Sequence, residues 1–175
     1  MPTSTFTHSL FGKITFKTQS PVWRRGDTIE FLDGFNVADI TEISVPQLKA
    51  IPGASKGKLM FHKSGHAQLL QAFADIEALG LLKFVTTCAG SLNFRLRKPV
   101  SGALSKLPSN HAFGIAIDLN SDDKALGASV KPVAPVFEAL GFTWGAAFSD
   151  PMHFKINEFI AKPKSVMKHL VDHVG

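Results

Sequence analysis

The chain has 175 residues, of which 45% are hydrophobic and 19% are charged, and its formal net charge is +5. This length and composition predict one globular domain that can bury a core. No stretch approaches the roughly 20 apolar residues of a membrane span, so stable membrane insertion is not expected. The single cysteine, Cys88, excludes an intrachain disulfide and any zinc site built from several cysteines.

The positive charge is spread along the chain, with only short pairs such as Arg24-Arg25 and Arg97-Lys98. A net charge of +5 gives a general attraction for polyanions. Domains that bind nucleic acid gather their basic residues into a patch or stripe. The sequence has no such block, so nucleic acid is not the expected partner.

The first part of the chain is rich in strand and turn signals. Alternating residues predict strands over 13–18 and 28–32, with a turn at residues 25–27. Residues 63–82 have a helical period instead, with Ser64 as the expected N-cap and Gly80 as the expected stop. The apolar stripe of this helix comprises Leu69, Leu70, Phe73, Ile76, Leu79 and Leu82.

The second part mixes short strands with helices. Residues 90–110 are expected to form a loop because proline and glycine interrupt them. We predict strands over 84–87, 115–119, 142–144 and 153–156, and helices over 133–140 and 165–174. The element order favours an α+β domain: a small, mostly antiparallel sheet with helices on one side and a functional cleft on the other.

A single domain over residues 1–175 is the expected organisation. Within it, residues 1–58 would form an N-terminal extension, 59–158 the core that carries the site, and 159–175 a basic C-terminal helix. An independent N-terminal domain is not expected, because about 50 residues alone bury little core.

Asp118 is the most informative residue, because an aspartate in an apolar strand is costly to bury unless it is paired or bound to a metal. If Ile115, Ile117 and Leu119 face the core, Asp118 faces the opposite side. Gly114 offers a break before the strand, which would let His111 leave it and approach Asp118. The stretch therefore supplies two candidate metal ligands.

A second short stretch repeats this arrangement. With Phe154 and Ile156 on the core face, His153 takes the other face of its strand. Asp150 lies three residues earlier, next to a proline that stiffens the approach. Two imidazoles and one carboxylate, with a fourth position open to water, make up the usual catalytic zinc site. A nearby carboxylate such as Asp150 could serve as general base.

These two stretches resemble the signatures of the M15 peptidases, the D-alanyl-D-alanine carboxypeptidase and L-alanyl-D-glutamate endopeptidase family. Residues 109–118 (SNHAFGIAID) are similar to the first signature and residues 150–154 (DPMHF) to the second. The resemblance covers roughly residues 60–158. It implies a hedgehog/D-Ala-D-Ala peptidase-like fold, one zinc ion held by His111, Asp118 and His153, and Asp150 as the catalytic base.

The resemblance also implies residues that contact the substrate. The family places an arginine upstream of the first signature, which steadies the substrate carbonyl and the developing oxyanion. Arg95 is our choice for this catalytic role, and Arg97 is the alternative two residues away. Ser109 is expected beside the first ligand, and Trp144 is expected to line the cleft. Lys155 departs from the family pattern, in which many members carry glutamate.

The activity that the resemblance implies is hydrolysis of peptide bonds in peptidoglycan by a zinc peptidase, with an endopeptidase preferred over a carboxypeptidase. A zinc-stabilised binding module without catalysis, similar to the hedgehog signalling domain, is the competing hypothesis. No secretory signal is visible at the N-terminus. We therefore expect a soluble monomer, made in the cytoplasm, that reaches the cell wall or periplasm by release or delivery.

Overall fold

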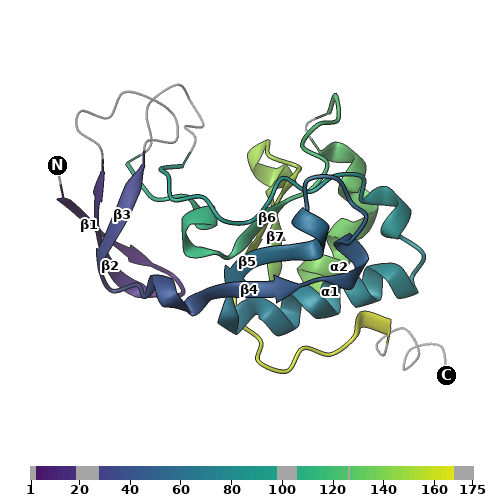
Figure 1. Cartoon of the computed structure of the whole chain (residues 1–175), viewed down its shortest axis with the longest axis horizontal. Helices are drawn as coiled ribbons and strands as arrows, with labels where there is room; N and C mark the ends of the chain where they lie inside the picture. Colours follow the sequence, from purple (N-terminus) through teal and green to yellow (C-terminus); the bar gives the residue numbers. More distant parts are fainter. Residues whose placement is uncertain (1–2, 19–27, 98–105, 126, 168–175) are drawn as a thin grey trace.

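The computed structural model describes residues 3–18, 28–97, 106–125 and 127–167, and it has the predicted α+β class (Figure 1). In the described part, the expected single sheet is divided into three separate antiparallel sheets. The strands are β1 (Thr3–His8), β2 (Gly12–Thr18), β3 (Ile29–Asp33), β4 (Ile40–Ser44), β5 (Lys58–His62), β6 (Ala116–Asp118), β7 (Phe142–Trp144) and β8 (His153–Ile156). The α-helices are α1 (His66–Ala78) and α2 (Ala134–Ala139).

The N-terminal sheet has the strand order β1-β2-β3 and lies at the left of Figure 1. Ile14 and Phe16 alternate with more exposed neighbours along β2, and both are buried. The strands predicted over 13–18 and 28–32 are confirmed: β2 begins one residue earlier than predicted and ends at the predicted residue, and β3 is displaced by one residue. The turn predicted at residues 25–27 lies outside the described residues.

Helix α1 runs beneath β4 and β5 (Figure 1) and begins two residues later than its expected cap. Ser64 lies in a short 3₁₀ turn, where its N–H donates to Nδ1 of His62 at 3.2 Å, so Ser64 is not the N-cap. Gly80 ends the helix with a φ of 70°, as glycine readily does. The apolar stripe is narrower than predicted, because Leu70 is 39% exposed.

The C-terminal sheet has the order β6-β8-β7, and β7 and β8 have the bounds that the sequence predicted. The strand predicted over 84–87 was wrong. The side-chain oxygen of Asn120 accepts hydrogen bonds from the backbone N–H groups of Thr86 and Thr87, at 2.8 and 3.2 Å. These N–H groups are therefore bound to a side chain and not to the backbone of a neighbouring strand. The other predicted elements are shorter: the strand over 115–119 becomes β6, and the helix over 133–140 becomes α2.

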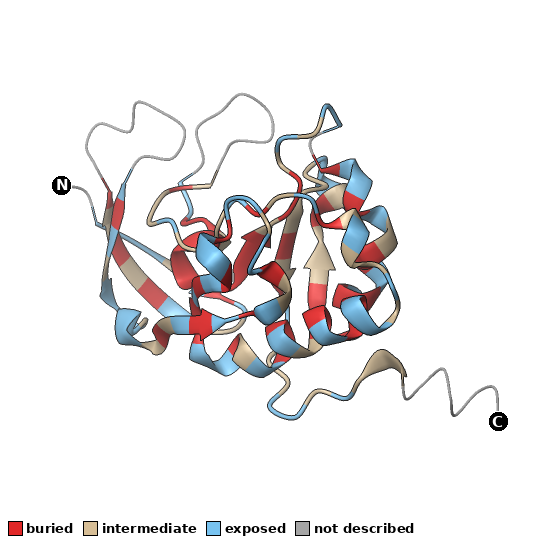
Figure 2. Ribbon diagram, turned by 45° about the vertical axis from the view of Figure 1, so that its right-hand side comes forward, coloured by how far each residue is buried: buried red, intermediate tan, exposed pale blue. Residues whose placement is uncertain are grey.

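One face of the C-terminal sheet packs on the helices. The Phe154 ring of β8 stacks on Phe137 of α2 at 4.4 Å, and Ile117 of β6 is fully buried beside them. Figure 2 shows that the helices and the strands carry many buried residues where they lie against each other. The opposite face carries Asp118 and His153, as the alternation predicted. The sequence thus placed helices on one side of this sheet and the candidate ligands on the other.

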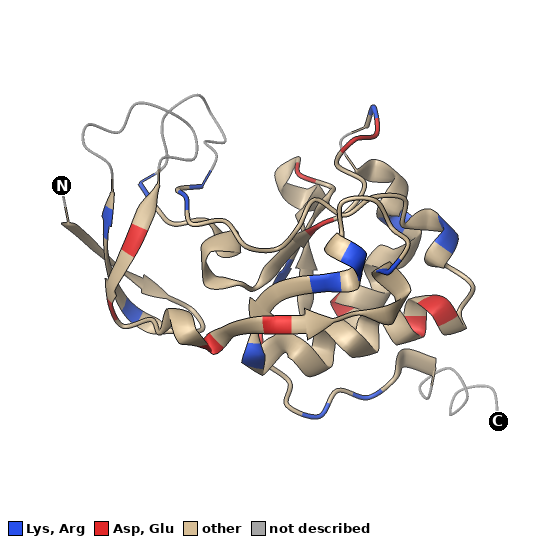
Figure 3. Cartoon of the chain, viewed as in Figure 1, with Lys and Arg blue, Asp and Glu red and all other residues tan. Residues whose placement is uncertain are grey.

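None of the described helices is long and apolar enough to cross a bilayer. Basic residues are scattered over the described elements (Figure 3). The division of the domain into an N-terminal extension, a core and a C-terminal helix, at residues 58 and 158, remains a prediction. Most of the predicted C-terminal helix, from residue 168 onward, lies outside the described residues.

Candidate metal centre

His111 reaches the site because the chain makes a short 3₁₀ turn before β6. The turn, η6 (Asn110–Phe113), is capped by Ser109, whose hydroxyl accepts the N–H of His111 at 3.3 Å. Gly114 ends the turn in the left-handed region, with a φ of 66°. Only glycine adopts this conformation without strain. His111 therefore leaves the line of the strand, as the sequence predicted.

Asp118 and His153 are direct cross-strand partners on β6 and β8, so their side chains share one face of the sheet. Oδ1 of Asp118 lies 3.2 Å from Nε2 of His111 and 3.0 Å from Nδ1 of His153. The ligand atoms of the three residues all lie within 4.8 Å of one another. One turn and one pair of strands thus bring together the three residues that the sequence singled out.

This donor set fits a zinc ion. Zinc–ligand bonds of about 2.0–2.1 Å in a tetrahedron place neighbouring ligand atoms about 3.3 Å apart. The two distances from the Asp118 carboxylate, 3.2 and 3.0 Å, are close to this spacing. Two neutral imidazoles and one carboxylate also match the composition of catalytic zinc sites, which leave the fourth position to water.

A backbone carbonyl on the side of the ring away from Asp118 orients the His111 imidazole. Its Nδ1 lies 3.4 Å from the backbone oxygen of Ser91, so an Nδ1–H donor leaves Nε2 free to face the site. A carbonyl behind a metal-binding histidine sets the tautomer in this way. Ser91 itself is held in place because its hydroxyl donates to the Met60 carbonyl at 2.5 Å. Sequence reasoning missed Ser91, because a backbone acceptor leaves no signature in the side chain.

The electrostatics keep Asp118 ionised. Burial alone would raise the pKa of this carboxyl, but hydrogen bonds with His111 and His153 outweigh burial and hold the pKa well below its ordinary value. A carboxylate that remains charged at every physiological pH is a suitable ligand for a divalent cation. The Asp118 side chain is 17% exposed, as is that of His153, so both remain accessible from solvent.

Asp150 lies at the rim of the site. Its Oδ2 is 4.0 Å from Nδ1 of His153, and its side chain is 45% exposed. The turn that carries it is tightly built: the Asp150 N–H donates to the Gly145 carbonyl at 2.9 Å, and the Asp150 carbonyl accepts from the His153 N–H at 3.0 Å. A Cβ on Gly145 would lie 2.2 Å from the Asp150 carbonyl oxygen, so only glycine fits there.

Trp144 supports the same turn. Its Nε1 donates to the Pro151 carbonyl at 2.6 Å, and its ring lies parallel to that of Phe154 at 6.5 Å. Because Trp144 is the cross-strand partner of Phe154, it belongs to the face of the sheet turned away from His153. This placement favours a positioning role over a contact with substrate. Ser109 is also buried, and its hydroxyl accepts a hydrogen bond from the first ligand residue.

The two candidate arginines differ in their surroundings. Nη1 of Arg95 donates to the Leu96 carbonyl at 3.1 Å, and no contact within the described residues joins Arg95 to the three ligands. Nε of Arg97 donates to the Pro108 carbonyl at 3.0 Å. Burial lowers the pKa of Arg97. Burial also lowers the pKa of Lys155 on β8, and the charge of Arg97 adds to this shift. The charge of Arg97 therefore acts on the strand that carries His153.

Comparison with known proteins identifies the stretch that holds the site. Residues 103–156 match the D-alanyl-D-alanine carboxypeptidase family among the M15 peptidases. The matched stretch contains the three candidate ligands and Asp150, and it confirms the resemblance to M15 peptidases that both signatures indicated. Searches of curated proteins and of solved structures find no match.

Proposed function

We propose that this protein is a zinc-dependent peptidase that hydrolyses peptide bonds in the stem peptides or cross-links of peptidoglycan. The observation that carries the proposal is the position of Asp150, a solvent-exposed carboxylate 4.0 Å from the site nitrogen of His153. The family match over residues 103–156 supports a peptidase. A binding module would need the three ligands, but it would have no use for a base at this rim.

The residues divide the chemistry between them. A zinc ion held by His111, Asp118 and His153 would lower the pKa of its water toward ~7 and polarise the substrate carbonyl. Asp150 accepts the proton of the attacking water and then delivers it to the leaving amine. Its exposure keeps this carboxylate in contact with solvent and available to substrate. The Ser91 carbonyl holds the imidazole of His111 in the required tautomer.

The bond that is cleaved separates two forms of this activity. We favour an endopeptidase, because the chain resembles the shorter cell-wall hydrolases of the family, such as those of phage lysins. The family match carries the description of a D-alanyl-D-alanine carboxypeptidase, which favours the alternative. Mass spectrometry of muropeptides digested by the protein decides between them, since loss of one terminal alanine and cleavage within the peptide give different product masses.

Replacement of the base tests the proposal. Asp150→Ala should retain about one zinc per chain and lose about 10²–10⁴-fold in the rate of cell-wall clearance. Zinc content is measured by elemental analysis, and clearance by the turbidity of purified cell walls with and without a chelator. Glu42→Ala, an exposed carboxylate on β4, is the matched control and should behave as the unchanged protein.

Two results would contradict the proposal. Full activity of Asp150→Ala would remove the base from the mechanism. Zinc binding by the unchanged protein without any clearance, on walls of several peptide types, would favour the binding module.

A further inference from the structure

A cavity outside the candidate metal centre lies where the N-terminal sheet meets the end of β5. It has a volume of about 480 Å³. Its walls come from the turn between β1 and β2, from the connection between β3 and β4, and from the last residue of β5. Figure 1 shows the connection between β3 and β4 at the lower edge of the N-terminal sheet. Of the described residues that line this cavity, none is a candidate metal ligand, so the cavity is a separate site.

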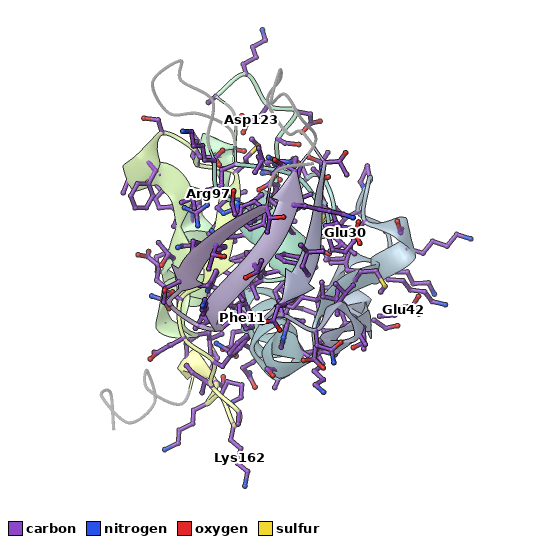
Figure 4. The ribbon with its side chains drawn as sticks, turned by 90° about the vertical axis from the view of Figure 1, so that its left-hand side faces the viewer. Phe11, Glu30, Glu42, Arg97, Asp123 and Lys162 are labelled. Carbon is purple, nitrogen blue, oxygen red and sulfur yellow. The ribbon has the colours of Figure 1, made fainter. Side chains whose placement is uncertain are left out.

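Three aromatic rings line the cavity. The rings of Phe11 and Phe35 meet edge to face at a centroid distance of 4.9 Å, and the ring of His62 lies 5.2 and 6.0 Å from them. Both phenylalanines are partly exposed, whereas His62 is buried. Figure 4 shows Phe11 at the lower edge of the N-terminal sheet. The face of an aromatic ring is electronegative, so rings that surround a hollow at different angles attract a cation.

His62 does not itself supply this cation. Burial lowers the pKa of its imidazole, and the opposing effect of the Asp39 charge is smaller. The Ser64 N–H donates to Nδ1 of His62 at 3.2 Å, which requires that this nitrogen carry no proton. His62 is therefore a neutral ring at pH 7 and adds to the two phenylalanines.

Two carboxylates also line the cavity. Asp33 is exposed at the end of β3, and no basic nitrogen of the described residues lies within 4.0 Å of it. Asp39 already binds an ammonium group, because Nζ of Lys63 lies 2.9 Å from its Oδ1. The Lys63 side chain is 60% exposed, and ion pairs of such exposed lysines are weak. The three side chains together leave a net negative charge beside the rings.

The backbone holds this wall in position before anything binds. Gly34 has a φ of 85°, and a Cβ there would clash with the backbone of β2, so the chain approaches that strand closely between Asp33 and Phe35. Asn36 caps the following 3₁₀ turn, η1 (Val37–Asp39), because its side-chain oxygen accepts a backbone N–H of the turn at 3.1 Å. A site whose groups are held in place loses little entropy when a ligand binds.

We propose that this cavity binds a primary ammonium group on an aliphatic chain, namely the side chain of a lysine-type residue in a peptide. The N–H groups of such a cation match the carboxylate oxygens of Asp33 and Asp39 with charge-assisted hydrogen bonds. Its methylene groups lie against the aromatic rings. The inference goes beyond the proposed peptidase function and does not depend on it, since the cavity contains neither the metal ligands nor Asp150.

The test uses two small probes that differ only in the ammonium group. One is Nα-acetyl-lysine amide, and the other is the same molecule with its Nε also acetylated. Binding to the full chain with zinc present is followed by NMR, through the chemical shifts of the backbone amides. The lysine probe should bind at least about fivefold more tightly than the acetylated one. It should shift the signals of Gly34 and Asn36.

Two pairs of variants test the charges. Asp33→Asn should weaken binding of the lysine probe at least about fivefold, whereas Glu42→Gln, on β4 outside the cavity, should leave it unchanged. Lys63→Met frees Asp39 from its ion pair and should strengthen binding about threefold or more. Lys58→Met removes the same charge from an exposed position at the start of β5 and should change the affinity by less than about twofold.

The aromatic wall is tested by Phe35→Leu, which keeps an apolar side chain but removes the ring and should weaken binding about threefold. Equal affinity for the two probes, absence of binding, or unchanged binding by Asp33→Asn would overturn the proposal. Shifts confined to His111, Asp118 and His153 would place the probe at the metal and would overturn it as well. Because the substituted charges are exposed, the NMR spectrum of each charge variant should show an intact fold. Cell-wall clearance has no part in this test, so the cavity and the peptidase activity can fail independently.

Discussion

The N-terminal and C-terminal sheets have the same number of strands but differ in what they carry. Strands β1 to β3 have five to seven residues each and hold none of the candidate ligands. Strands β6 to β8 have three or four residues, yet two of them hold Asp118 and His153, and their stretch matches a peptidase family. The candidate ligands thus lie on the shorter elements, whose positions depend on capped turns and on neighbouring strands.

The two regions meet at Phe113, two residues after His111. Its ring contacts the aromatic rings of the N-terminal region at centroid distances of 4.5–6.2 Å: those of Phe6, His8, Phe11, Phe31 and Phe35. Figure 4 shows the N-terminal sheet in front of the C-terminal ribbon, with Phe11 at its lower edge. The N-terminal sheet therefore supports the turn that positions His111, although it contributes no candidate ligand itself.

Replacement of Asp118, the carboxylate between the two histidines, should show the difference between the two sheets most clearly. Asp118→Asn keeps the shape of the side chain but removes the charge that faces both histidines. We expect zinc affinity to fall by at least about 100-fold, more than the loss of an outer-shell partner causes, and cell-wall clearance to reach background. Zinc titration with a competing chelator measures the affinity.

The matched control for this change is Glu30→Gln on β3, an exposed carboxylate paired with Lys17. It should leave zinc affinity unchanged. If Asp118→Asn binds zinc as tightly as the unchanged protein, the metal is held elsewhere and the contrast between the two sheets disappears.

Removal of the aromatic ring between the regions should affect both of them. Phe113 is fully buried, so Phe113→Ala should lower the free energy of unfolding by about 3–5 kcal/mol. Denaturant unfolding of the metal-free protein measures this value. Because Phe113 and His111 share one turn, zinc affinity should fall as well.

Phe148→Ala is the control for this change, since Phe148 is 65% exposed and its loss should alter stability by no more than about 0.5 kcal/mol. If Phe113→Ala loses much stability but keeps its zinc affinity, the N-terminal sheet does not support the turn η6 that carries His111.

The sequence predicted the grouping of the three candidate ligands better than it predicted their surroundings, for a physical reason. His111, Asp118 and His153 are signalled by polar side chains in apolar stretches, and the positive φ of Gly114 follows from its lack of a Cβ. The Ser91 carbonyl behind His111 could not be found, because every residue has the same backbone acceptor. Contacts that depend on the backbone of a distant loop have no residue-type signal.

The same limit explains the errors in the fold. Residues 84–87 have strand-type side chains, but the amide of Asn120, more than 30 residues away, binds their N–H groups. Likewise, Arg95 and Arg97 are equivalent in sequence, and only the packing of the loop distinguishes them. The division into three sheets depends on long-range pairing in the same way, and strand patterns do not specify it.

A smaller effect, on the pH dependence of stability, should come from His8. This residue lies at the end of β1, and its ring contacts Phe113 of the turn η6. The pKa of His8 is lowered to about 4, chiefly by burial; a hydrogen bond with Asn110 opposes this shift, and the charges of Arg97 and Lys155 add to it. Because the pKa is lower in the folded protein than its ordinary 6.5, the unfolded chain binds more protons between these values. Stability from this residue is therefore complete above about pH 6.5 and is lost as the pH falls toward 4.

His8→Gln should remove this dependence. Between pH 7 and pH 4.5, the metal-free protein should lose about 2.5 kcal/mol more stability than the His8→Gln variant, as measured by denaturant unfolding at each pH. His66 is the matched control, because its ring lies outside the contact between the two regions, on α1 beside Thr41. His66→Gln should retain the full dependence. If the unchanged protein and His8→Gln lose stability in parallel, His8 is not held neutral against the turn η6.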